Sequence, residues 1–404
     1  MAGSSATLSS PFFTDVHRAM AEAVDTYLER LGGRRDELLR TILDQRRYPD
    51  ELMEAMASLG VVGAMIPEEY GGSGAGLLAV AVAMERFSAY GLGNTLAMLT
   101  VMDGLAILRG GSESQRLKLL PAIAEGRLKL AFAITEPDAG TNSFNIGLRA
   151  RRDGSAYRLT GEKAWITGVD RADMVLVVAR TTGREEVARA GLPKAFGLSL
   201  FLVPTDAPGM SRTEMSTVGI EGFSQFHLHF DDAEVAEENL IGEPDQGAAV
   251  LFEALNPERI IGSSLSVGLT DYFLTRAVEY ANQRRVFGER PIGAYQAVAH
   301  PLARIRANQE AARALMYSAA EAYDRYAPSS VVGTYANMAK LLSSENAFEA
   351  ADRAIQTHGG NGFVADYMLI QMLAPARLAK TAPINNEMIL NYIAEHDLGL
   401  PRSY

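Results

Sequence analysis

The sequence predicts an α+β fold that is mainly helical, with helical segments at both ends and a small β domain between them. Apolar residues recur at helical spacing up to about residue 130, then fall into strand-like runs up to about residue 243. Helical spacing returns after that and continues toward the end of the chain. The predicted domains are an N-terminal helical domain over residues 1–130, a central β domain over 131–243 and a C-terminal helical domain over 244–404.

The N-terminal segment is predicted to be a helical bundle. Its apolar residues follow one another mostly three or four positions apart, which is the spacing of one face of a helix. These residues include Leu39, Ile42, Leu52, Met56 and Leu59, and further along Leu78, Val82 and Phe87.

The central segment is predicted to form strands, because its apolar runs are short and lie between glycines and prolines. Two such runs are Met174–Val178 and Leu198–Val203. The C-terminal segment is predicted to be helical from Gly247 onward. Its helical stripes contain Leu265, Leu269, Phe273 and Ala277 in one place and Phe348, Ala351 and Ile355 in another.

Composition narrows the classes of function. The chain has 404 residues, 48% hydrophobic and 22% charged, which is enough to bury one large core or several smaller ones. A net charge of -11 disfavours binding to the phosphates of nucleic acids. The absence of cysteine excludes disulfides, thiolate nucleophiles and iron–sulfur clusters, so redox chemistry would require an organic cofactor. The first eleven residues lack a basic start and an apolar run, so we expect a soluble, cytoplasmic protein without a membrane span.

Two other patterns are weak signals. The glycines of Gly72-Ser-Gly-Ala-Gly76 resemble a dinucleotide-binding fingerprint, but Pro67–Tyr70 separates them from any strand and no convincing βαβ unit follows. His227 and His229 share one face of a predicted strand, where they could hold a metal ion. We expect both histidines to face solvent, and no metal is expected because no third ligand is evident.

Two segments favour a flavin site. In Ala131–Asn142 a strand leads into a turn containing Thr135, Glu136 and Gly140, whose amides and hydroxyls would suit the edge of an isoalloxazine ring. An ordinary β-turn is the alternative. About thirty residues later, Trp165-Ile-Thr167 places the only tryptophan near a hydroxyl, although a lone tryptophan is more often a core residue.

Together these segments resemble the acyl-CoA dehydrogenase family, and the resemblance extends through most of the chain. It also rests on Pro67–Gly72, Arg284–Gly288, Tyr295-Gln296 and Gln356–Phe363. The resemblance implies an N-terminal helical domain, a central β domain and a C-terminal four-helix domain, with FAD between the β domain and the helices. It also implies that part of the FAD site comes from a neighbouring subunit, and hence a homodimer or homotetramer.

The resemblance assigns candidate binding residues one by one. Arginine suits a pyrophosphate because its donors form a fixed fork, and glycine allows a bound group to approach the backbone closely. Taken alone, the glycines after Gln356 would indicate a helix cap or a tight turn. The expected FAD-binding residues are Phe132, Ile134, Thr135, Gly140, Thr141, Trp165, Ile166, Thr167, Arg284, Val286, Phe287, Gln296, Gln356, Gly359, Gly360 and Asn385. The expected substrate-binding residues are Thr141, Asn256 and Arg259.

The usual position of the catalytic base is not occupied by an acidic residue in this chain. An ungapped match to the family puts Pro383 where most relatives carry the catalytic glutamate, and proline cannot accept a proton. Isovaleryl-CoA and long-chain acyl-CoA dehydrogenases place the base on a helix instead, and the segment Leu255–Ile260 resembles that motif with Glu258 at the base position. The alternative is that Asn256-Pro-Glu258 only begins a helix, with asparagine as N-cap and proline at the first position.

Pro383 also lacks the N–H that relatives use to bind the thioester carbonyl. We expect the Ile384 N–H, or the side-chain amide of Asn385 or Asn386, to replace it. The predicted reaction is α,β-dehydrogenation of an acyl thioester of CoA or acyl carrier protein. The expected electron acceptor is an electron-transfer flavoprotein or another acceptor. A flavin oxidase or monooxygenase, and a non-catalytic partner subunit of a heteromeric dehydrogenase, are the alternatives.

Overall fold

A computed structural model describes residues 10–402 of the chain, which form two compact units. The sheet unit consists of Arg46–Gly74 and Thr95–Glu258. The helical unit consists of residues 10–45, Ala75–Asn94 and 259–402. The structure is mainly helical with one central sheet, so the predicted fold class is confirmed.

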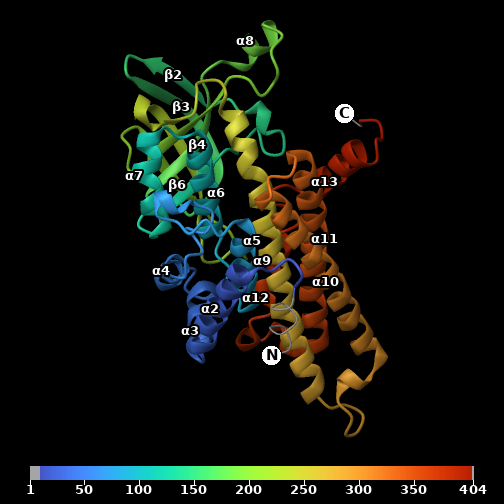
Figure 1. The fold of residues 1–404 in the computed structure, drawn as a ribbon. Coiled ribbons are helices and arrows are strands. Elements are labelled where there is room, and N and C mark those ends of the chain that lie inside the picture. Colours follow the sequence, from blue (N-terminus) through green and yellow to red (C-terminus); the bar gives the residue numbers. More distant parts are fainter. Residues whose placement is uncertain (1–9, 403–404) are drawn as a thin grey trace. The chain divides into compact units, whose positions relative to one another are not determined.

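The sheet unit is built on an eight-stranded sheet with the order β6-β7-β3-β2-β4-β5-β8, and β1 pairs with β4 (Figure 1). Strand β1 runs parallel to β4, with Phe132 opposite Leu176. The two apolar runs predicted as strands form β4 and β5, whose side chains are buried almost throughout because they fill the core of this unit. Helix α6 packs against β1 and α7.

The strands are β1 Leu130–Ala133, β2 Arg149–Asp153, β3 Ala156–Thr167, β4 Met174–Arg180, β5 Leu198–Pro204, β6 Met210–Met215, β7 Gln225–Ala236 and β8 Leu240–Ile241. The helices of this unit are α4 Asp50–Ser58, α6 Thr95–Gly110, α7 Glu113–Ala124 and α8 Arg184–Arg189, with the short turns η1 Glu68–Tyr70, η2 Ser143–Asn145 and η3 Glu237–Asn239. Helix α9 Gly247–Gln283 begins in this unit and continues into the helical unit.

The helical unit contains the long helices α10 and α11, which pack against each other, and α5, which packs against α2 and α10 (Figure 1). Its helices are α2 Asp15–Leu31, α3 Arg34–Leu43, α5 Leu77–Ala89, α10 Gln296–Asp324, α11 Ser329–His358, α12 Ile370–Leu378 and α13 Asn386–Tyr392. Its short turns are η4 Ile292–Ala294, η5 Gly359–Phe363, η6 Ala365–Tyr367 and η7 Ile393–Asp397.

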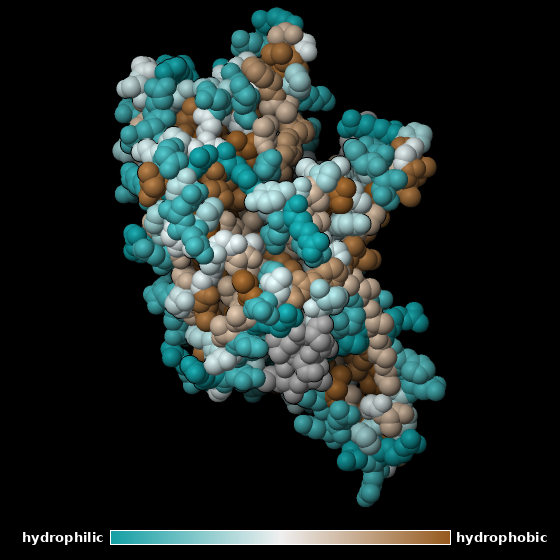
Figure 2. All heavy atoms as spheres, in the orientation of Figure 1, coloured by the Kyte–Doolittle hydropathy of each residue, from teal (hydrophilic) through white to brown (hydrophobic). Residues whose placement is uncertain are grey.

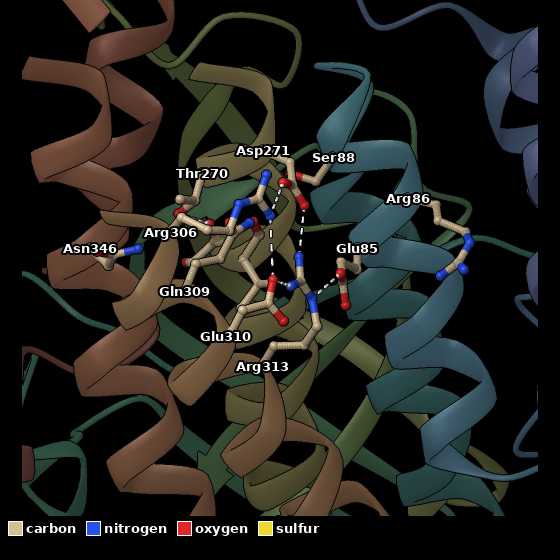
Figure 3. A network of polar contacts seen from close by, with 12 residues as sticks. Glu85, Arg86, Ser88, Thr270, Asp271, Arg306, Gln309, Glu310, Arg313 and Asn346 are labelled. Carbon is tan, nitrogen blue, oxygen red and sulfur yellow. Dashed lines mark hydrogen bonds and ion pairs between the residues drawn. The ribbon is translucent and has the colours of Figure 1, made fainter. Parts of the chain in front are cut away.

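A buried ion-pair network joins three helices of the helical unit (Figure 3). Arg313 of α10 donates to Glu85 of α5 at 2.7 Å and to Asp271 of α9 at 2.7 Å. The second oxygen of Glu85 accepts from the Tyr317 hydroxyl at 2.6 Å. Because Glu85 and Arg313 are buried, Asp271 is largely buried and each of these charges has a partner, the network fixes how α5, α9 and α10 pack.

Helix α9 rules out one alternative. It begins at Gly247 and continues without interruption past Pro257, so Asn256-Pro-Glu258 lies inside a helix and does not start one. Proline has no N–H, so the carbonyl of Glu253 cannot receive the usual bond from residue 257. The helix tolerates this loss because Leu251, Ala254 and Ile260 are buried on either side of the proline.

The dinucleotide-like glycines have a structural role. They precede α5 and follow the short turn η1, and no strand leads into them. At the start of α5, the carboxylate of Asp324 accepts from the N–H groups of Leu77 and Leu78 at 2.7 and 2.9 Å. A carboxylate of the protein therefore occupies the helix terminus that a bound phosphate would need.

The two histidines lie on β7, where His229 is exposed and His227 is half-buried. Their neighbours Phe226, Leu228 and Phe230 are buried, so the predicted alternation is confirmed. Among residues 10–402, no three histidine, aspartate or glutamate side chains gather as a metal site would require. Within the same residues, no helix combines the length and apolar character needed to cross a membrane.

Candidate functional site: a clamped turn and a buried carboxylate

A salt bridge clamps the turn that follows β1. Lys163 of β3 donates to the carbonyl oxygen of Ile134 at 2.8 Å and to the Glu136 carboxylate at 2.9 Å. That carboxylate also accepts from the N–H groups of Gly147 and Leu148 at 2.6 and 2.9 Å. These bonds hold the first part of the segment in which the sequence predicted flavin contacts against β3 and against the backbone just before β2.

Burial changes the pKa of Lys163 and strengthens its attraction to Glu136. The Lys163 side chain is fully buried, and that burial lowers the pKa of its ammonium group to about 8, against the opposing effect of Glu136. Glu136 is 12% exposed, so both partners lie in a low-dielectric environment where their attraction is strong. The clamp is therefore costly to break.

The turn itself is open to a ligand. Gly140 and Thr141 are exposed, while Phe132, Ile134 and Thr135 are half-buried. No protein atom lies within 4 Å of where a Cβ of Gly140 would stand, and its φ angle is not in the left-handed region. The fold does not require glycine at this position, whereas close approach of a bound group to the backbone would.

Trp165 stands next to this turn on an irregularity of β3. The pairing of β3 with β7 shifts register between Lys163 and Ile166, and Trp165 has a φ of 60°. Bulges of this kind redirect a side chain, and positive φ in a bulky residue is uncommon. The Trp165 side chain is 56% exposed, so the alternative that it belongs to the core is wrong.

The end of β3 brings Thr167 to Gln225. The Thr167 hydroxyl donates to the Gln225 side chain at 3.0 Å, and Gln225 is itself buried. The hydroxyl oxygen still has lone pairs to offer to a ligand. Ile166 is buried at 1% exposed, so only its backbone remains for a cofactor.

The β1 turn and the bulge are adjacent, because the Ala164 N–H donates to the Thr135 carbonyl at 2.9 Å. The structure thus brings the two predicted flavin segments of the sheet unit together. Asn256 and Glu258 lie in the part of α9 that belongs to the same unit. Glu258 is 8% exposed, which is unusual for a carboxylate and requires a structural or chemical reason.

The helical unit carries the other predicted FAD-binding residues. Arg284 follows the end of α9, and its N–H donates to the carbonyl of Tyr280. The Tyr280 hydroxyl accepts from the Asn361 side chain at 3.0 Å, and its ring stacks on His358 at 4.1 Å. Tyr280 therefore holds the Arg284 segment beside the turn that contains the predicted glycines.

Most of these residues are exposed. Phe287 is 99% exposed and has a φ of 52°. Gly360 has no protein atom within 4 Å of a hypothetical Cβ and has an ordinary φ angle, as Gly140 does. The remaining exposed members are Arg284, Gln296, Gln356 and Gly359, whereas Val286 and Arg259 are half-buried.

A buried lysine holds the loop around Pro383 through two hydrogen bonds. Lys340 of α11 donates to the Ile384 carbonyl at 2.6 Å and to the Asn386 side chain at 2.7 Å. Burial lowers the pKa of Lys340 to about 8. The Pro383 ring lies 3.8 Å from where a Cβ of Gly262 would stand, so this glycine gives the loop room to pack on α9.

The same loop excludes one candidate donor for a thioester. The side-chain amide of Asn386 donates to Ser344 and Glu345 at 3.1 and 2.8 Å, and its backbone N–H donates to the Lys380 carbonyl. Asn385 instead caps α13, with its side-chain oxygen accepting from the Met388 N–H at 2.8 Å. The expectation that Asn386 could bind a substrate carbonyl is therefore wrong.

The sequence reasoning did not assign roles to four residues that support these segments. Lys163 and Glu136 lie inside the very motifs that predicted the flavin site, and Lys340 and Gln225 lie on regular elements. A lysine at an inward position of a strand was a usable signal, because an unpaired lysine is almost never fully buried. The partners themselves are set by tertiary contacts.

Comparisons with known proteins agree along most of the chain. Family models match the N-terminal, middle and C-terminal domains of acyl-CoA dehydrogenase at residues 14–127, 131–233 and 245–398. The acyl-CoA dehydrogenase FadE12 of Mycobacterium tuberculosis is 40% identical over 395 residues, covering 97% of this chain and 98% of that protein.

Solved structures show the same similarity. Butyryl-CoA dehydrogenase from Megasphaera elsdenii has a TM-score of 0.84 at 28% identity, covering 94% of this chain and 97% of that one. A structure described as the electron transferring flavoprotein of Acidaminococcus fermentans has a TM-score of 0.87 at 28% identity, covering 96% and 98%. The FAD complex of PigA has a TM-score of 0.85 at 25% identity, covering 96% and 98%.

The clamped turn, the exposed bulge and the open glycine fit a flavin, and these matches agree with that fit. The chain belongs to the acyl-CoA dehydrogenase family and is an FAD-dependent flavin oxidoreductase.

Proposed function

We propose that this protein catalyses the α,β-dehydrogenation of an acyl thioester of coenzyme A or acyl carrier protein, with Glu258 as the base. The observation that carries the proposal is the buried carboxylate of Glu258 in the interior of α9, in a chain whose usual base position holds Pro383. A helix start would have explained Glu258 without catalysis, and the continuous helix removes that explanation.

The protein's own residues supply binding and proton transfer. Glu258 removes the α-proton of the thioester and keeps it on its carboxylate. Bound FAD supplies the acceptor for the hydrogen and electron pair that leave the β-carbon. The turn residues Thr135 to Thr141 and the bulge at Trp165 bind the flavin edge, and the Lys163–Glu136 clamp keeps that surface in place.

The thioester carbonyl needs hydrogen-bond donors to stabilise the enolate-like charge that develops on it. Pro383 has no N–H and the donors of Asn386 are engaged. The Ile384 N–H and the side-chain amide of Asn385 remain. We assign the role to the Ile384 N–H, because Asn385 caps α13 and the Lys340 bond to the Ile384 carbonyl holds the loop in place.

Two subunits share each FAD site in this proposal. Phe287 is almost fully exposed in a single chain, beside Arg284, and a large aromatic side chain gains free energy when a partner covers it. Figure 2 also shows apolar residues at the surface of the long helices, between hydrophilic ones. Electrons then leave to an electron-transfer flavoprotein or another acceptor, and a similar structure is described as such a flavoprotein.

The test compares two isosteric variants under anaerobic conditions. Glu258→Gln should leave FAD binding intact and lower the rate of flavin bleaching by acyl-CoA by about 10²–10⁴-fold, the usual effect of losing a general base. Glu387→Gln, an exposed change in the first turn of α13, should bleach at the wild-type rate.

The opposite results are informative. Loss of bleaching in Glu387→Gln alone would show that the register of the C-terminal loop is wrong. Normal bleaching in both variants would refute a carboxylate base and favour an oxidase or monooxygenase.

A further inference from the structure

A second carboxyl group lies buried in the sheet unit, and no bond within the described residues explains it. Asp103 of α6 is 0% exposed, and neither of its carboxylate oxygens has a hydrogen-bond partner in that part of the chain. Buried polar groups are normally hydrogen-bonded, and an ionised carboxylate without donors is very costly to bury. The Asp103 carboxyl must therefore be neutral, or a nearby group must act on its charge without a hydrogen bond.

Helix contacts identify that nearby group. The start of α9 runs antiparallel to the end of α6, since a Cβ at Gly110 would lie 2.8 Å from the Val250 side chain and Arg109 pairs with Glu253 at 3.7 Å. Asp103 is about 9 Å before Arg109 along α6, and Glu258 is about 7.5 Å beyond Glu253 along α9. Residues 103 and 258 therefore lie at about the same level along this helix pair.

The charges around Asp103 agree with this placement. Burial raises the pKa of Asp103 well above its usual value, and the negative charge of Glu258 raises it further. Strands β1 and β8, which also pack on α6, contain no titratable residue, and the charged residues of α7 are Glu113, Arg116 and Lys118.

We propose that Asp103 is a positioning residue for the base: Asp103 and Glu258 hold one proton between them, Asp103 keeps it, and Glu258 is left ionised to accept the substrate's α-proton. This inference rests on the proposed role of Glu258. Contact between Asp103 and the substrate is not part of it, because a side chain with no exposed surface does not line an open site.

The pairing has a kinetic consequence. While Asp103 is protonated, it adds no charge beside Glu258. When Asp103 ionises at alkaline pH, two negative charges become neighbours, and transfer of the α-proton to Glu258 relieves their repulsion. The rate of α-proton abstraction should then rise a second time toward alkaline pH.

Infrared spectroscopy of the FAD-loaded protein tests the pair directly. A band from a buried protonated carboxyl should persist at neutral pH and disappear in Asp103→Asn. In Glu258→Gln, the pH midpoint of that band should fall by about one unit or more, because the repelling charge is gone. Glu253→Gln, five residues earlier on α9 and exposed, is the matched control and should leave the midpoint unchanged.

An identical midpoint in the wild type and in Glu258→Gln would overturn the pairing, as would a neutral-pH band that survives Asp103→Asn. These results do not depend on catalysis, so they stand whether or not Glu258→Gln still bleaches the flavin.

The pH profile of anaerobic bleaching gives the functional test. The wild type should show the second alkaline rise, and Asp103→Asn should instead reach a plateau with the same acid limb. Parallel profiles in the two proteins would show that Asp103 does not act on the base.

Discussion

Replacing Lys163 by methionine should loosen the turn that we propose binds the flavin and destabilise the sheet unit. The change removes a fully buried ammonium group that bonds Glu136 and the Ile134 carbonyl. Breaking a buried pair by removing one partner typically costs about 3–5 kcal/mol. We expect about 3 kcal/mol, the lower end, because Glu136 keeps two backbone N–H donors and is 12% exposed.

The loss can be measured in two ways. For a domain of this size, about 3 kcal/mol corresponds to a fall in Tm of roughly 6–12 °C by calorimetry. The Kd for FAD should also rise, since each loss of about 1.4 kcal/mol in binding free energy weakens affinity tenfold. The double variant Glu136→Gln/Lys163→Met should cost less than the sum of the two single changes, because the single changes each leave an unpaired partner.

The control is Lys129→Met, which removes a partly exposed ion pair to Asp173 at 3.6 Å. Exposed pairs contribute about 0–1 kcal/mol, so its Tm should change little. Equal shifts in Lys129→Met and Lys163→Met, or unchanged Tm and FAD affinity in Lys163→Met, would refute the clamp.

Two further predictions concern the helical unit and the cofactor. Glu85→Gln should lower the free energy of unfolding by about 3 kcal/mol, because it removes the charge that Arg313 and Tyr317 bond. The control Glu321→Gln, from an exposed pair with Arg325, should lower it by less than about 1 kcal/mol. Similar losses for both variants in a denaturant titration would contradict the role of the network. The chain has no cysteine, so we also expect acid or heat denaturation to release intact FAD, and flavin that stays with the polypeptide on gel filtration in denaturant would contradict this.

The fold class could be predicted from the sequence because hydrophobic spacing directly reflects burial. Met174–Val178 and Leu198–Val203 became central strands, and the stripe at Leu265 to Ala277 became part of α9. Local rules failed where tertiary packing outweighs them. Asn256-Pro-Glu258 has the composition of a helix start, yet buried neighbours on both sides carry the helix through the proline.

The candidate site was predictable only in part, for a related reason. Motif residues such as Gly140 and Trp165 could be named in advance, but the bulge that exposes Trp165 depends on how β3 pairs with β7. Partners distant in sequence were not predictable at all. Lys340 bonds the Ile384 carbonyl, and the charge of Glu258 raises the pKa of Asp103, only because the fold brings residues distant in sequence near one another.

The single tryptophan has a practical consequence for anyone who studies unfolding of this protein. All tryptophan emission comes from Trp165, at the bulge in β3, so a fluorescence melting curve of the FAD-free protein reports on the sheet unit. Far-UV circular dichroism is dominated by helices, most of which belong to the helical unit. Recorded side by side, the two signals separate the unfolding of the units: coincident midpoints would mean that they unfold cooperatively, and distinct midpoints would give the stability of each.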